Sequence, residues 1–356
     1  MKFSGYKFYM QIMLLNLIFL ILIYFSSFIL INGQRTRPKE TSEYLQIDLT
    51  LGKKFGLEPN SSIPNDVLRR VEQGAANGNR DNIYFLGLLR LYGIELTKNE
   101  AGAANEFRRA ADLGLPEAMT AYGMCAYLGL GMETDETLAV KWFRRAIAVK
   151  DINGYWMLAK MLLEGSAGPP NYAEAVAYFT IAAQEHIPQA EHHLGIMYEY
   201  GLGVEENFEK AADWYRRATE KQYLESMYHL GLMYSHGRPG FQQDFHLAFP
   251  LFEAGARSGH GPSQYMLGIF FAFGYGFEPE YTTAIKWFER AVGSGDDRIL
   301  DKATNAAQEL IDFMAEAHKV NEEIMNKYQQ QANQYDDEED EDEDEEDDID
   351  IEDDEF

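Results

Sequence analysis

Apolar and small residues return along this chain with a period of 36 residues, lengthened once to 37. Each period contains an apolar residue followed by glycine or alanine, and another glycine comes six residues after that pair. The pairs are Leu86-Gly87, Tyr122-Gly123, Leu158-Ala159, Leu194-Gly195, Leu230-Gly231 and Leu267-Gly268. A fixed period of this length is typical of a stacked array of one supersecondary unit. The pattern therefore predicts a repeat protein rather than a globular enzyme fold.

The fourth copy shows the pattern within one unit. Ala190, Leu194 and Tyr198 are spaced four residues apart and lie on one face of a predicted first helix. Gly195 falls in the middle of this helix, where glycine costs about 1 kcal/mol relative to alanine, so we expect a partner helix to approach closely there. The helix should end at Gly201–Gly203, because glycine readily adopts the left-handed conformation of helix C-termini.

A second helix follows in each copy, and its start is marked by a residue that can cap it. Five of the six residues at this position have short polar side chains that accept an unpaired backbone N–H. The six are Asn99, Asp135, Asn171, Asn207, Asp244 and Glu280. Most copies then carry an aromatic pair between small residues, namely Trp142-Phe143, Tyr178-Phe179, Trp214-Tyr215 and Trp287-Phe288. An aromatic stripe at helical spacing indicates core packing between hairpins rather than a cofactor pocket.

These residues closely resemble the Sel-like repeat (SLR) family, a relative of the tetratricopeptide repeats. The fourth copy matches the family pattern at Ala190, Leu194-Gly195, Tyr198, Gly201-Leu202-Gly203, Ala211, Trp214-Tyr215 and Ala218. The resemblance covers about Asn82 to Gly295, and the first and third copies depart from it at Glu106 and Ala159. It implies an all-α, α/α superhelical solenoid of six hairpins, and a scaffold that assembles protein complexes.

The chain is expected to divide into five segments. Val67 and Val71 lie one period before the second helix of the first copy, which predicts an N-terminal half-repeat. Apolar residues at helical intervals between Ile299 and Tyr328 predict a closing helix over the last hairpin. The segments are a signal sequence or signal anchor (1–33), a linker (34–66), the SLR solenoid (67–295), a C-terminal capping helix (296–334) and a disordered acidic tail (335–356).

The N-terminal segment predicts entry into the secretory pathway. No charged residue occurs between Phe8 and Gln34, and Met10–Ile31 is almost wholly apolar. This run has the length of a membrane-spanning helix, so an uncleaved single-pass anchor is favoured over a cleaved signal, which remains open. We expect the endoplasmic reticulum membrane or lumen, with a lumenal repeat body. A glycosylation sequon at Asn60 is compatible with that orientation.

The C-terminal segment is strongly acidic. Asp or Glu occupies 18 of the 21 positions from Asp336 to Phe356, and this run supplies most of the net charge of -27. Such a run repels itself and is expected to be disordered. Three roles remain open: a solubilising tail, weak Ca²⁺ buffering and docking to a basic partner. The acidity disfavours nucleic-acid binding, which requires a basic face.

A column of mostly aromatic residues on the first helices is the candidate protein-binding site. It reads Tyr84, Thr120, Trp156, His192, Tyr228 and Tyr265, one residue from each copy. Rigid amphipathic side chains favour peptide contacts on the concave wall of a solenoid. The alternative is that the column packs between neighbouring repeats. Glu199 and Tyr127, at the outer edge of the same stripe, are the candidates for specificity.

The fifth copy is irregular, and no copy carries recognisable chemistry. It has one extra residue at Gly237–Gly240, and Pro250 is expected to kink its second helix or to be tolerated there. No phosphate loop, nucleophile elbow or metal-ligand spacing occurs, and Cys125 is the single cysteine. We therefore expect no enzymatic activity, cofactor, metal site or small-molecule substrate.

The combination of SLRs with secretory entry is similar to lumenal adaptors of ubiquitin-ligase complexes in the endoplasmic reticulum. The resemblance implies a non-enzymatic adaptor that binds proteins, in quality control or ER-associated degradation (ERAD). The alternative function is a lumenal calcium-buffering or chaperone-like factor that acts through its acidic tail.

Overall fold

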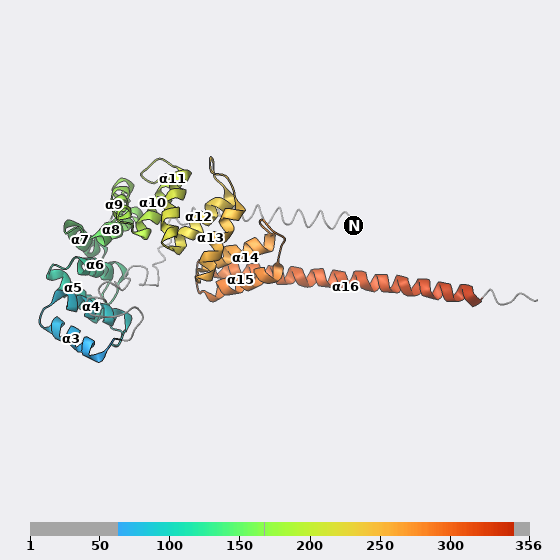
Figure 1. The fold of residues 1–356 in the computed structure, drawn as a ribbon, viewed down its shortest axis with the longest axis horizontal. Coiled ribbons are helices and arrows are strands. Elements are labelled where there is room, and N and C mark those ends of the chain that lie inside the picture. Colours follow the sequence, from blue (N-terminus) through green and yellow to red (C-terminus); the bar gives the residue numbers. More distant parts are fainter. Residues whose placement is uncertain (1–62, 167, 345–356) are drawn as a thin grey trace, which may run out of the picture. The chain divides into compact units, whose positions relative to one another are not determined.

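The computed structural model describes residues 63–166 and 168–344. The predicted signal or anchor, almost all of the predicted linker and residues 345–356 lie outside these ranges. The chain divides into two compact units, Met1–Asp151 and Ile152–Phe356. Every long regular element in the described residues is a helix, as predicted for an all-α solenoid (Figure 1).

The first unit contains five described helices. They are α3 (Asn65–Ala76), α4 (Arg80–Tyr92), α5 (Glu100–Asp112), α6 (Pro116–Leu128) and α7 (Glu136–Ala148). The two helices of each predicted copy form an antiparallel hairpin, α4 with α5 and α6 with α7, and α5 also packs against α6. Helix α3 packs against α4. It therefore occupies the place of the predicted N-terminal half-repeat.

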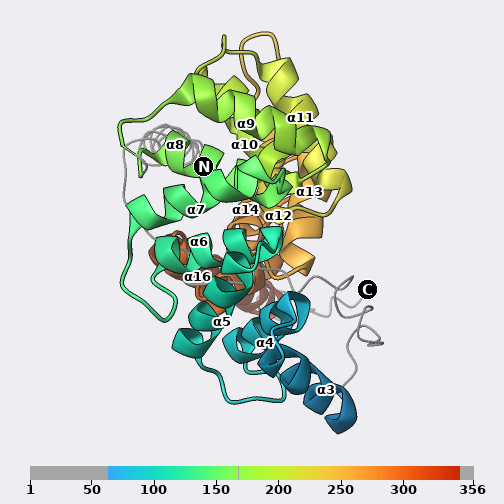
Figure 2. The same ribbon diagram turned by 90° about the vertical axis from the view of Figure 1, so that its left-hand side faces the viewer.

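The second unit contains the other four hairpins and a long closing helix. Its helices are α8 (Ile152–Glu164), α9 (Tyr172–Gln184), α10 (Pro188–Tyr200), α11 (Phe208–Glu220), α12 (Leu224–His236), α13 (Phe245–Arg257), α14 (Gly261–Phe273), α15 (Tyr281–Gly293) and α16 (Leu300–Asp344). Each helix packs against the next from α8 to α16, and Figure 2 shows helices α9 and α10, which belong to neighbouring hairpins, side by side. Helix α13 continues through Pro250 without a break.

The mid-helix glycines allow aromatic rings to reach the backbone of the first helices, as expected. A Cβ on Gly195 would lie 2.5 Å from the ring of Tyr215, and one on Gly123 would lie 2.7 Å from Phe143. The same contact joins Gly87 to Phe107 in the first copy. The ring comes from the second helix of the same hairpin in each case, so glycine sets how closely the two helices pack.

The predicted N-caps and C-terminal turns are confirmed. Five of the six predicted N-cap side chains accept a backbone N–H, and Glu280 is the exception. Gly129 and Gly201 adopt left-handed conformations at the ends of α6 and α10. In the second unit, a Cβ on Gly203 would lie 2.7 Å from the backbone of Tyr172, at the start of α9. The second glycine of this turn thus lets one hairpin lie against the preceding one.

The closing helix extends farther than the predicted boundary. Helix α16 begins at Leu300, packs against α15 and continues past residue 334 to Asp344, within the first part of the segment expected to be disordered. Figure 1 shows it as one long helix that extends beyond α14 and α15. None of the helices in residues 63–166 and 168–344 combines the length and the apolar character needed to span a membrane.

Candidate protein-binding surface

The predicted column on the first helices is largely buried between helices. Tyr84, Thr120, Trp156 and His192 are all buried, and only Tyr228 and Tyr265 keep part of their surface exposed. The Tyr84 ring lies 5.6 Å from the ring of Phe107, and the Tyr265 ring lies 5.7 Å from that of Phe288. These neighbours belong to the second helix of the same hairpin. At these two positions the column thus packs inside a hairpin, whereas the alternative in the sequence analysis placed it between neighbouring repeats.

Glu199 lies in a buried polar network rather than on an open wall. Its side chain is 5 % exposed, and it accepts a 2.8 Å hydrogen bond from the hydroxyl of Tyr215 on α11. Arg238 contacts its other carboxylate oxygen at 3.3 Å. Copies with phenylalanine at the Tyr215 position have no hydroxyl to satisfy there. Glu199 is therefore matched to a tyrosine found at this position in the fourth copy alone.

The extra residue of the fifth copy supplies the cation of this network. Arg238 and Phe241 form an isolated antiparallel bridge in the loop between α12 and α13. The bridge closes a tight turn around Pro239 and Gly240, and the guanidinium of Arg238 reaches back to Glu199 in the preceding copy. The insertion thus links two neighbouring hairpins within the second unit.

Histidines continue the network along α10 and α12. His192 Nδ1 lies 2.9 Å from the hydroxyl oxygen of Ser226, and its ring lies 5.1 Å from that of His229. His229 Nδ1 lies 4.0 Å from Glu199. Burial lowers the pKa of His192, and it lowers the pKa of His193 to about 3. These histidines are therefore neutral at physiological pH.

A second ionic cluster joins α12 to the segment before α16. Glu225 contacts Arg298 at 3.2 Å and His260 at 3.4 Å, and Asp296 also contacts Arg298. Burial opposes ionisation of Glu225, but contacts with His260 and Arg298 outweigh it and hold its pKa below the usual range. The cluster stabilises the charged form of Glu225 and anchors the last turn before the closing helix.

The structure therefore brings together only part of the predicted site. His192, Glu199 and Tyr228 meet around the ring of His229, which lies 5.7 Å from Tyr228. Trp156 and Tyr265 belong to other hairpins of the second unit, and the half-buried Tyr127 belongs to the first unit. No group of three or more His, Cys, Asp or Glu side chains in the described residues is arranged to hold a metal ion.

An aromatic surface that the sequence analysis missed lies on the fifth and sixth copies. Its members are all at least partly exposed, and they are Phe245, Phe249, Phe271, Phe273, Tyr275 and Phe277. Phe277 contacts Phe249 and Phe271 at ring distances of 5.5 and 5.2 Å. The Phe245 and Tyr275 rings stack at 4.6 Å. The sequence signal for this surface is the density of aromatic residues from Phe270 to Phe277.

Helices α13 and α14 and the loop after α14 position this aromatic surface. The residues from Ile269 to Phe273 are all apolar and cover every side of α14. Some of these side chains therefore lie outside the packed interior. Gly274 takes a left-handed conformation and ends the helix. The following loop then places Tyr275 and Phe277 over α13. A partly exposed aromatic group of this kind suits contact with an apolar segment of another protein.

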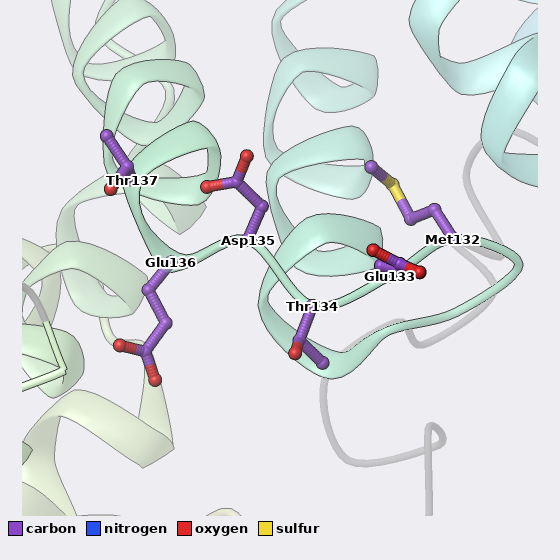
Figure 3. Close-up of a pocket in the computed structure, with 6 residues that line it drawn as sticks. All are labelled: Met132, Glu133, Thr134, Asp135, Glu136 and Thr137. Carbon is purple, nitrogen blue, oxygen red and sulfur yellow. The ribbon is translucent and has the colours of Figure 1, made fainter.

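Two surface hollows in the described residues do not resemble binding sites for small molecules. One of about 500 Å³ is formed by the loop between α6 and α7, Met132–Thr137, and includes three carboxylates (Figure 3). Asp135 in this loop is already used as the N-cap of α7. The other, of about 290 Å³, lies between Asn207 and Pro239. Both are open, polar loop surfaces rather than enclosed pockets.

Comparison with known proteins identifies relatives of all or part of the array. The chain is 27 % identical over 295 residues to the chitin synthase regulator SKT5 of Saccharomyces cerevisiae, covering 80 % of this chain and 42 % of that protein. It is 32 % identical over 99 residues to HRD3B of Arabidopsis thaliana, a component of an ERAD-associated E3 ubiquitin-protein ligase, covering 27 % and 15 %. The chain thus spans less than half of the length of these curated relatives.

Solved structures with the same fold are also similar. The Sel1 repeat protein of Oxalobacter formigenes superimposes with a TM-score of 0.59 at 26 % identity, covering 64 % of this chain and 94 % of that one. The SLR protein c5321 of uropathogenic Escherichia coli gives 0.57 at 27 %, covering 74 % and 56 %. The Sel1 repeat model matches residues 83–115, 116–149, 152–186, 188–223, 224–260 and 261–296. This chain therefore belongs to the Sel1 repeat family.

Proposed function

We propose that this protein is a non-enzymatic scaffold that binds a partner protein through the aromatic surface of its fifth and sixth copies. The observation that carries the proposal is the group of touching, partly exposed rings around Phe249 and Phe277. The predicted column and Glu199, in contrast, are largely engaged in packing and hydrogen bonds inside the hairpins. Aromatic side chains dominate binding energy at protein interfaces, because they bury a large area with little loss of rotamer freedom.

The relatives support an adaptor role in particular. One relative is named as the regulator of an enzyme, and another is named as a component of a ubiquitin ligase. Both names therefore define the protein by its relation to an enzyme. With the apolar N-terminal segment, this favours a place in the secretory pathway, in quality control or ERAD. The partner is then a protein of that pathway, and the aromatic surface takes an apolar segment of it.

Site-specific photo-crosslinking tests this proposal. A photoreactive side chain at Phe277, which is 36 % exposed, should capture a partner in cells, and mass spectrometry should identify it as a secretory-pathway protein. The control position is Leu113, which is 50 % exposed on the first unit. We also expect Phe277→Ser to reduce recovery of this partner at least tenfold, and Leu113→Ser to leave it unchanged.

Three outcomes would count against the proposal. Equal capture from both positions would show nonspecific contact with exposed apolar side chains. A second outcome is that Trp156→Ala abolishes recovery of the partner while Phe277→Ser does not, with an intact fold by circular dichroism. This result would place the binding site at the predicted column instead. Partners found only in the cytosol would contradict the proposed location.

A further inference from the structure

The closing helix α16 has a packed part and a projecting part. Its first turns lie against α15, and the ring of Phe313 lies 5.6 Å from that of Tyr281 on α15. Phe313 and Met314 are half-buried, whereas every side chain from Ala315 to Lys327 is exposed. The helix therefore continues past the last hairpin without a second helix beside it in the described residues (Figure 1).

An apolar stripe continues along the projecting part. Ala317, Val320 and Ile324 follow Phe313 at intervals of four, three and four residues, which places them on one side of the helix. Val320 is 48 % exposed and Ile324 is 41 % exposed. Alternating intervals of three and four are the spacing by which one helix packs along another in a two-stranded coiled coil.

The same helix leads into a run of negative charge. All nine residues from Asp336 to Asp344 are acidic, and they occupy the last turns of α16. A carboxylate is unfavourable at a helix C-terminus, because the helix macrodipole is also negative there. Like charges four residues apart on a helix repel each other. Lys or Arg side chains on a neighbouring helix would offset both effects.

We propose that α16 is a docking helix for a basic amphipathic helix of a partner protein. The partner's apolar stripe packs on Ala317, Val320 and Ile324, and its Lys or Arg side chains face the acidic end of α16. A second copy of this chain fits poorly. A parallel pair would place two acidic runs together, and an antiparallel pair would direct each acidic run toward the part of α16 that α15 covers. This surface is separate from the aromatic surface.

A designed peptide tests the proposal with the purified full chain. The probe is a 28-residue peptide with Leu and Ile at the two apolar heptad positions and Lys at most other positions. We expect it to bind with an affinity that falls as salt rises, and to increase the helical circular dichroism signal. A peptide with the same stripe but Glu in place of Lys should not bind, nor should a scrambled peptide of the same composition.

Matched variants separate the stripe from simple charge attraction. The double variant Val320→Asp/Ile324→Asp should weaken binding at least tenfold, although its two added negative charges would strengthen a purely electrostatic contact. The control is Ile311→Asp/Met325→Asp, which changes two exposed apolar residues on other sides of the helix and adds the same charge. It should leave affinity unchanged or slightly higher.

Three outcomes would overturn the proposal. They are equal effects of the two double variants, binding of the scrambled peptide, and self-association of the unliganded chain through α16 in analytical ultracentrifugation. None of these readouts depends on Phe277, so the docking helix and the aromatic surface can fail separately. Calcium titration of the same sample addresses the alternative role of the tail, because a buffer would bind Ca²⁺ at the acidic run without needing Val320 or Ile324.

Discussion

At the scale of single residues, glycine sets how closely the two helices of a hairpin pack, because it has no Cβ. The ring of Tyr215 lies against the backbone at Gly195, and the rings of Phe143, Phe252 and Phe288 lie against corresponding glycines. Glycine destabilises a helix interior, but here it permits a fully buried aromatic ring to make contact. The third copy has Ala159 at this position, so its hairpin accommodates a methyl group that the others lack room for.

The variant Gly195→Ala tests this contact. Its new Cβ would lie 2.5 Å from the Tyr215 ring, so overpacking should lower the free energy of unfolding by about 1–3 kcal/mol, despite a gain in helix propensity. The matched control is Gly293→Ala in α15, where no atom lies within 4 Å of the new Cβ. It should raise stability by up to about 1 kcal/mol. Urea unfolding measures both, and a stabilised Gly195→Ala variant would contradict the packing argument.

At the scale of elements, the second glycine in the turn after a first helix lets neighbouring hairpins approach in two copies. Gly203 has φ +73°, and its Cα faces the backbone of Tyr172 at the start of α9. Gly131 makes the same approach to Glu100 at the start of α5 in the first unit. The corresponding residue of the first copy is Glu95, also at positive φ, and within the described residues no complete hairpin precedes it. At Gly131 and Gly203, glycine therefore leaves room for the backbone of the preceding hairpin.

Comparing Gly203→Ala with Gly240→Ala isolates the contact from the backbone strain. Both residues have positive φ, so each substitution should cost about 1–2 kcal/mol of strain. A Cβ on Gly240 meets nothing within 4 Å, whereas one on Gly203 meets backbone at 2.7 Å. We expect Gly203→Ala to lose at least about 1 kcal/mol more in chemical denaturation. Equal losses would show that the turn does not set the spacing between hairpins.

At the scale of the whole molecule, the second unit contains buried polar groups that make its stability depend on pH. Burial lowers the pKa of His192, His193 and His229 below the ordinary value of 6.5. The unfolded chain therefore binds protons at these sites near pH 6.5, whereas the folded chain does not. The stability that they contribute is complete above pH 6.5 and declines as the pH falls below it. Glu225, with its lowered pKa, adds a loss below about pH 4.5.

We therefore expect the free energy of unfolding to be level between pH 7 and 8 and to fall below pH 6.5. One histidine with a folded pKa of about 3 accounts for about 2 kcal/mol of loss by pH 5. Denaturation curves between pH 8 and 5 measure this. The variant His193→Phe should remove one proton from the slope, because the buried Nδ1 of His193 has no hydrogen-bond partner and its ring stacks on Phe179. An unchanged slope would place the proton uptake elsewhere.

The sequence alone determined the repeat, its caps and the position of the aromatic pair. These follow from local physics: a period of 36 residues, a short polar side chain before each second helix, and a glycine where a helix must end. They need no knowledge of distant contacts, because each hairpin packs mainly against its neighbours. The N-terminal segment and the tail beyond residue 344 stay predictions.

Which side chains remain available to a partner depends instead on how the helices and loops pack together. A residue such as Glu199 has the same spacing whether it faces solvent or Tyr215, and its burial depends on Arg238, which lies 39 residues later. The exposure of Phe277 likewise depends on how its loop crosses α13, and that of Val320 on where α15 ends. Helical periodicity assigns a residue to a face, but the elements packed on that face decide whether the residue is covered.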